Sequence, residues 1–229
     1  MIRLLKYDWR RNMTYLLSAF VLFVLGELAV EWFVSNSDAA VSLMIIGYAA
    51  MLVFIVVSAV KTYVKNIGSS GRRMLPVTSL QHILSPLVMG LAGTLVIGLL
   101  FVLHFSMSTT FQHYTEFDQV SSLDPGSVVL LGLSGLESMM FELLLFFLAY
   151  TIGRSLRVKF KAVIIVAAYL VLQNGLLLIE DALKLDNLGL NSSEFFSMKL
   201  VSASTVFELI CSLVMIVVMV KLIDKRVEV

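Results

Sequence analysis

Long runs of apolar residues, interrupted only briefly by polar ones, dominate the pattern along this chain. A membrane-spanning helix needs about 20 mostly apolar residues. Six stretches of about that length occur, at 14–33, 41–60, 83–103, 128–152, 162–179 and 201–223. Runs such as LVIGLLFVL are apolar on every side, as expected of a helix surrounded by lipid, and the alternation typical of a membrane β-barrel is absent. The pattern predicts an all-α, polytopic membrane protein whose single transmembrane domain covers residues 1–229.

Composition supports the same class. Hydrophobic residues make up 59% of the 229 residues and charged residues 14%, whereas an ordinary soluble domain has about 45–50% and about 25%. A soluble protein of this size could not bury so much apolar surface. One cysteine and three prolines also exclude a disulfide scaffold and a proline-rich linker protein.

Charge along the chain predicts the orientation of the helices. Of the 17 lysines and arginines, all but Lys184 and Lys199 lie before the first stretch, between the second and third, between the fourth and fifth, or around the C-terminal end. The segments on the opposite side are acidic, so the net charge of +1 is a cancellation. Because cytoplasmic loops carry the excess of basic residues, we expect both termini in the cytoplasm and the protein in a cell membrane, most simply a bacterial plasma membrane.

The N-terminal segment MIRLLKYDWRRNM predicts an amphipathic helix that lies in the membrane interface. Steps of three and four residues place apolar side chains on one face, namely Ile2, Leu5, Trp9 and Met13. A neighbouring face carries basic side chains, namely Arg3, Lys6 and Arg10. We expect Trp9 at headgroup level and the basic face toward anionic lipid, although Asp8 and Asn12 interrupt the apolar side. The alternative is a basic flank that fixes topology and has no further role.

The segment 65–82, between the second and third stretches, predicts a short ordered element outside the membrane. Glycines and serines end the preceding helix near 68–71, and Thr78-x-x-Gln81 has the pattern of a capping box that opens the next helix. Basic and apolar side chains suited to docking a soluble partner follow one another here: Arg72, Arg73, Met74, Leu75, Pro76, Val77 and Thr78. The alternative is a basic loop without a partner.

These features together resemble the membrane subunit of an ABC-2 type permease, the membrane-spanning part of an ATP-binding cassette exporter. Members often begin with a string like MxxLLKxDxRR, matched here by MIRLLKYDWRR, and often carry an LPVS-like stretch before the third helix, matched by LPVT at 75–78. The basic residue that often follows this stretch is replaced by Ser79, and a lysine often found slightly later is absent around Ser85.

The resemblance implies that 65–82 is a coupling helix seated on a cytoplasmic ATPase subunit. It also implies a dimer with a second permease subunit, identical or related, in a lipid membrane. The chain has no G-x-x-x-x-G-K-[ST] phosphate loop, so we do not expect an enzyme: ATP and Mg²⁺ would be bound by the partner ATPase, and this chain would bind no cofactor. The expected substrate is a peptide or another amphipathic compound, and no nucleic acid is expected as a partner.

Four glutamates within the predicted spans are candidates for a functional role: Glu137, Glu142, Glu27 and Glu208. A charge in hydrocarbon is costly, so such residues often face a cavity, a partner or a pathway. For Glu137 and Glu142 the alternatives are an acidic substrate pathway or proton site and a buried packing residue. For Glu27 and Glu208, as for Glu31, solvation at the membrane interface is the expected account.

These glutamates also support an alternative function, an ion-gradient-driven secondary transporter or channel. A scaffold or immunity factor without transport is a third hypothesis. An intramembrane serine protease is not expected: G-x-S-G occurs at 132–135, but all three histidines precede Ser134 and no later helix offers a base. No H-E-x-x-H pair occurs either, so no metal site is expected.

Overall fold

The computed structural model describes residues 2–34, 36–68, 78–108, 125–156, 160–183 and 203–226. In this part of the chain six helices account for the fold: α1 (Ile2–Phe33), α2 (Ser37–Gly68), α4 (Ser79–Met107), α7 (Pro125–Ser155), α8 (Lys161–Ala182) and α9 (Ala203–Arg226). Each contains a segment long and apolar enough to cross a membrane. This confirms the prediction of an all-helical, multi-pass membrane protein.

The helices are longer than the spans predicted from the apolar runs. Five of the six predicted spans lie inside a helix, and the last helix begins at residue 203 rather than 201. α1 and α2 have 32 residues each, which corresponds to about 48 Å at about 1.5 Å per residue. The hydrocarbon core of a bilayer is only about 30 Å thick, so the helices extend beyond it by polar turns at their ends. A search for apolar runs does not detect these polar turns.

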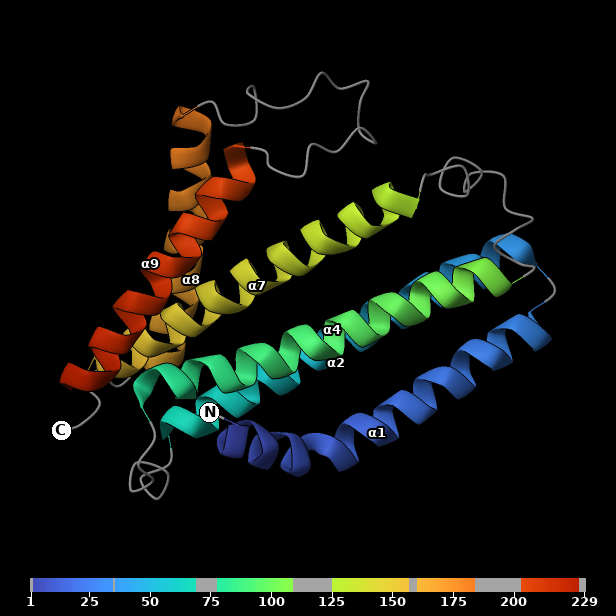
Figure 1. The fold of residues 1–229 in the computed structure, drawn as a ribbon, viewed down its shortest axis with the longest axis horizontal. Helices are drawn as coiled ribbons and strands as arrows, with labels where there is room; N and C mark the ends of the chain where they lie inside the picture. The colour runs from blue at the N-terminus through green and yellow to red at the C-terminus, as the bar shows by residue number, and fades with distance from the viewer. Residues whose placement is uncertain are drawn as a thin grey trace.

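Consecutive helices run in opposite directions, so their ends collect at two ends of the bundle. Both chain termini lie at one of these, together with the starts of α4 and α8 and the ends of α2, α7 and α9 (Figure 1). We refer to it as the terminal end and to the opposite one as the distal end. All lysines and arginines in the described residues lie at the terminal end.

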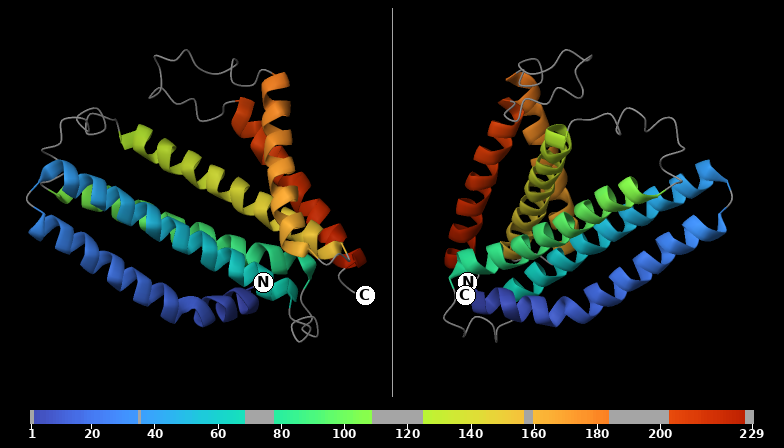
Figure 2. Two further views of the ribbon diagram at one scale, coloured as in Figure 1. Left: turned by 180° about the vertical axis from the view of Figure 1, so that it is seen from behind. Right: turned by 45° about the vertical axis from the view of Figure 1, so that its right-hand side comes forward.

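Two groups of three helices make up the bundle. α1, α2 and α4 lie side by side, while α8 and α9 both contact α7. The groups contact each other near the terminal end, mostly through α4 and α7, and diverge toward the distal end (Figure 2).

Tyr63 of α2 joins the two groups. Its side chain is fully buried, its ring stacks on Phe147 of α7 with centroids 4.0 Å apart, and its hydroxyl lies 2.6 Å from Thr151 Oγ1. Met219 of α9 packs in the same cluster. Aromatic stacking and a shared hydroxyl hydrogen bond therefore fix α7 against α2 at this level.

α8 lies at the edge of the bundle. None of its residues is buried, and large apolar side chains such as Val163, Val166 and Val171 are exposed. In a membrane this face is turned to lipid or to another helix. α8 approaches α7 closely at Gly153, where an added Cβ would overlap the side chain of Ile165.

The first predicted span and the predicted N-terminal interfacial helix are one continuous helix, α1. Figure 1 shows its first turns bent away from the axis of the remainder. The bent part approaches α2 and α4.

Half of the predicted coupling segment 65–82 lies outside the described residues, including Arg72, Arg73 and the stretch 74–77. Thr78 stands at the N-cap position of α4, but its side chain makes no capping hydrogen bond. The predicted capping box is therefore wrong in its chemistry. The Gln81 N–H donates instead to the Thr78 carbonyl at 2.9 Å, so the donor that the hydroxyl would cap is already satisfied.

Close approach of α7 and α8 yields a stability prediction. Gly153→Ala should lower the free energy of unfolding by about 1–3 kcal/mol, because the new methyl group overpacks the contact with Ile165. Gly98→Ala on α4 is the matched control, since nothing lies within 4 Å of an added Cβ there. It should be neutral or stabilising by up to about 1 kcal/mol, because alanine favours a helix. Titration with SDS followed by circular dichroism measures both, and equal changes would contradict the proposed contact.

Candidate functional site

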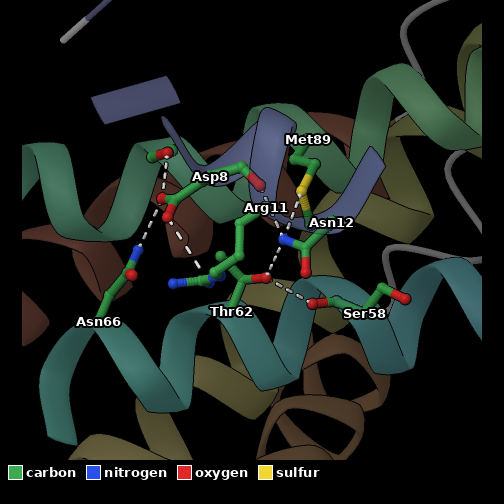
Figure 3. A network of polar contacts seen from close by, with 8 residues as sticks. Asp8, Arg11, Asn12, Ser58, Thr62, Asn66 and Met89 are labelled. Carbon is green, nitrogen blue, oxygen red and sulfur yellow. Dashed lines mark hydrogen bonds and ion pairs between the residues drawn. The ribbon is translucent and has the colours of Figure 1, made fainter. Parts of the chain in front are cut away.

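A buried polar network at the terminal end centres on Asp8 of α1, which is 0% exposed. Its Oδ2 atom accepts hydrogen bonds from Asn66 Nδ2 of α2 at 3.0 Å and from Ser85 Oγ of α4 at 2.8 Å. Its Oδ1 atom lies 3.6 Å from Arg11 Nη2 on the next turn (Figure 3). A buried carboxylate is tolerated only when it is paired and hydrogen-bonded, and both conditions are met here.

Asn12 extends the network by one turn. Its Nδ2 atom donates to Thr62 Oγ1 of α2 and to the Asp8 carbonyl, both at 2.9 Å, and lies 3.5 Å from Met89 Sδ of α4. A step of four residues from Asp8 to Asn12 thus matches a step of four back along α2, from Asn66 to Thr62. This is the register expected of antiparallel helices, in which residues four apart lie on one face.

The network ties α1 to both helices that flank residues 69–77. Asn66 lies two residues before the end of α2, and Ser85 lies in the second turn of α4. Asn66 is 1% exposed, and its Oδ1 atom has no hydrogen-bond partner among the described residues. The Asp8 carboxylate accepts hydrogen bonds from both α2 and α4. Displacement of α2 or of α4 would therefore disturb the hydrogen bond that joins that helix to α1.

Sequence reasoning missed the role of Asp8 and Asn12, which it treated as interruptions of an apolar face. A signal was present, because polar residues four apart on α1 are matched by Thr62 and Asn66, four apart on α2. Nothing in the sequence shows that these two pairs face each other.

The predicted interfacial anchor residues lie away from this network. Lys6 and Arg10 are exposed, and Trp9 is 36% exposed and donates from Nε1 to Met13 Sδ at 3.1 Å. The side chain of Arg3 lies outside the described residues. One face of the first turns of α1 is therefore polar and buried, and the other is basic, aromatic and open.

A second polar site lies between α7, α8 and α9, toward their distal ends. It is a pocket of about 130 Å³. It is lined by Ser138, Phe141, Glu142, Leu145, Gln173, Leu176, Leu177, Glu180, Phe207 and Glu208. Three lining residues are acidic and none of these described residues is basic, so the pocket is suited to a positively charged group.

Two of these carboxylates have hydroxyl donors. The Tyr169 hydroxyl donates to Glu142 Oε2 at 3.0 Å, and Ser204 Oγ donates to Glu180 Oε1. Glu137 of α7 does not line the pocket; it is half-buried, and its Oε1 atom has no hydrogen-bond partner among the described residues. The pocket thus brings together Glu142 and Glu208, two of the predicted candidates, and adds Glu180 from the end of α8.

Glu27 belongs to neither site, and its predicted solvation at the interface is wrong. Its side chain is 7% exposed because α2 covers it at Gly47, where an added Cβ would overlap Oε1. His104 of α4 contacts both neighbouring helices at the same end: Nδ1 lies 3.0 Å from the Tyr48 hydroxyl and Nε2 lies 3.7 Å from Glu31 Oε2. Close contact of α1, α2 and α4 at their distal ends explains the burial of Glu27.

Among the described residues no group of three or more histidine, cysteine, aspartate or glutamate residues could hold a metal ion. Comparisons of the chain with models of protein families, with curated proteins and with solved structures found no match. Function has therefore to be inferred from the residues and geometry of this chain.

Removing the central carboxylate tests the network. Asp8→Ala should lower the free energy of unfolding by about 2–3 kcal/mol, because hydrogen bonds to a charged acceptor are worth about 1.5–3 kcal/mol and are lost together with the ion pair to Arg11. Asp38→Ala serves as control: this aspartate is exposed in the first turn of α2, and its loss should cost less than about 1 kcal/mol. Titration with SDS measures the free energy of unfolding of both variants. Equal decreases for the two variants would show that Asp8 does not stabilise the position of α1.

Proposed function

We propose that this protein is the membrane-spanning subunit of an ATP-binding cassette exporter of the ABC-2 type, powered by a separate ATPase subunit. Both termini lie in the cytoplasm in this proposal, and the membrane is a bacterial plasma membrane. The first turns of α1 lie at the membrane interface. A second permease subunit, identical or related, completes the transport pathway.

The observation that carries the proposal is the position of Asp8. It belongs to the string MIRLLKYDWRR, which resembles the start of such permeases, and it bonds to Asn66 and Ser85 on the two helices that flank residues 69–77. The resemblance in 1–11 thus concerns a part of the chain that is bonded to both helices flanking residues 69–77, the segment that contains most of the second resemblance.

Charge supports the orientation. The lysines and arginines of the described residues lie at the terminal end, and residues 69–77 link two helices at that same end. By the rule that basic residues remain in the cytoplasm, this link is accessible to a cytoplasmic ATPase.

In the proposed mechanism, ATP-driven closure of the ATPase subunits pushes on segment 65–82. Movement of α2 and α4 passes to α1 through Asp8, and the two groups of helices change their relative position. Such coupling requires that the ATPase contact the two states differently. The pocket with Glu142, Glu180 and Glu208 would then meet cationic groups of a peptide or another amphipathic substrate.

Docking of the ATPase is tested by combining Arg72→Ala, Arg73→Ala and Leu75→Ala. An ATPase and the second permease should copurify with the wild-type chain from native membranes. We expect the triple variant to bind the ATPase at least about 10-fold more weakly, because loss of a few central contacts costs more than about 1.4 kcal/mol, and to lose transport.

A matched control is Lys161→Ala with Lys225→Ala, which removes exposed basic residues from the same end of the bundle. It should leave the complex intact. Absence of any ATPase in the purification, or unchanged binding and transport in the triple variant, would refute the proposal.

A second candidate function, an ion-gradient-driven transporter or channel, is favoured by the gathering of Glu142, Glu180 and Glu208 around one pocket. Like charges in a small site favour binding of a proton or another cation. In this case the glutamates drive transport and no ATPase is needed.

Proteoliposomes that contain only this chain separate the two functions. If the second candidate holds, a pH gradient alone drives transport, and Glu142→Gln reduces it at least about 10-fold because the pocket loses an ionisable group. Asp181→Asn, an exposed change at the distal end of α8, should have no effect. Transport that requires ATP and a partner ATPase would reject this candidate.

A further inference from the structure

A groove on the outside of α1, α2 and α4 has no assigned occupant. Its volume is about 210 Å³. It is lined by Trp9, Met13, Leu16, Leu17, Phe20, Met51, Ile55, Gly93, Val96 and Ile97. The one side-chain N–H among these residues, Trp9 Nε1, is donated to Met13 Sδ. Water would find no side-chain partner in the groove, so its occupant is apolar.

We propose that this groove holds one acyl chain of an anionic phospholipid, with the phosphate of the headgroup against Lys6 and Arg10. Binding of this lipid requires neither an ATPase nor a transported substrate. The headgroup site, at Lys6 and Arg10, lies on the face of α1 opposite Asp8.

The length of the groove fits one leaflet. From Trp9 to Phe20 it follows α1 for 11 residues, or about 16 Å at about 1.5 Å per residue. One leaflet of hydrocarbon is about 15 Å thick, half of about 30 Å. Two of its lining residues, Ile55 and Gly93, lie near the middle of α2 and α4. The groove therefore runs from headgroup level to the centre of the bilayer.

Positive charge stands at its outer end. Lys6 precedes Trp9 by three residues and Arg10 precedes Met13 by three, so each lies beside a lining residue on the helix surface. Arg11 is paired with Asp8. In contrast, no described residue forms an ion pair or hydrogen bond with the side chain of Lys6 or Arg10. Two cations that have no partner among the described residues, at the level marked by Trp9, suit a phosphate group.

The Asp8 network explains why this face is open. At 100° per residue, Lys6 and Asp8 point in nearly opposite directions around α1. Burial of Asp8 against α2 and α4 therefore turns Lys6 and Arg10 away from them, while Trp9, about 100° from Asp8, stays beside the groove. Gly93, another lining residue, packs against α2, since an added Cβ there would lie only 2.9 Å from Ile55 Cγ2.

Native mass spectrometry of the full chain tests the proposal. The protein is incubated with phosphatidylglycerol or with phosphatidylcholine of the same acyl chains, and the retained lipid is counted. We expect one phosphatidylglycerol molecule to be retained about 30-fold more strongly than phosphatidylcholine, the effect of two basic residues beside an anionic headgroup.

Two variants distinguish recognition of the lipid headgroup from binding of the acyl chain. Lys6→Gln with Arg10→Gln should abolish the preference for phosphatidylglycerol, whereas Lys161→Gln with Lys225→Gln, at the same end but away from the groove, should preserve it. Val96→Phe fills the groove and should weaken retention of both lipids. Val102→Phe is its control, because Val102 is an equally exposed valine on α4 outside the groove.

Several results would overturn the proposal. These are equal retention of the two lipids by the wild type, an unchanged preference in the Lys6 and Arg10 variant, or an unchanged retention in Val96→Phe. Displacement of the lipid by inorganic phosphate would indicate a simple anion site. A change of oligomeric state in Val96→Phe without a change in lipid would identify a second copy of the chain as the occupant. Circular dichroism checks that each variant is folded.

Discussion

The buried carboxylate of Asp8 is the constraint on which the position of α1 depends. A charge removed from water must be paired and hydrogen-bonded, and here the partners come from α1 itself, from α2 and from α4. They can converge on Asp8 only if α1 has one rotation about its axis and one register along α2. The same rotation leaves Lys6, Trp9 and Arg10 on the open side. A single polar residue thus determines both the contact of α1 with its neighbours and the surface that it offers to lipid.

The two polar sites belong to different groups of helices and to opposite ends of the bundle. The Asp8 network joins α1, α2 and α4 at the terminal end, while the acidic pocket lies among α7, α8 and α9 toward the distal end. Stacking of Tyr63 on Phe147 connects the groups near the terminal end, beyond which they diverge. In a transporter this arrangement would let a displacement applied at one end change the separation of helices at the other, because helices move largely as rigid bodies.

The acidic residues show how far sequence reasoning reaches. Glu27 and Glu142 both occur within apolar stretches of the sequence, where an ionisable residue is unusual. Their surroundings differ entirely: Glu27 is covered by α2 at Gly47, whereas Glu142 borders a pocket and accepts a hydrogen bond from Tyr169. These neighbours lie 20 and 27 residues away along the chain. Hydrophobic periodicity carries no information on such contacts, so solvation at the membrane interface was assigned wrongly to Glu27, which is buried.

The sequence by itself determined the six helices, their approximate spans and the separation of basic from acidic ends. These properties depend on local composition, because about 20 consecutive apolar residues suffice to make a span and the charge beside each span is read directly. Only the tertiary structure decided which polar residues meet. Asp8 and Asn12 look like flaws in an amphipathic helix until Asn66, Thr62 and Ser85 are placed opposite them. The physical reason is that the stability of a buried polar group depends on partners supplied by other helices, and neither spacing nor composition specifies which helices adjoin.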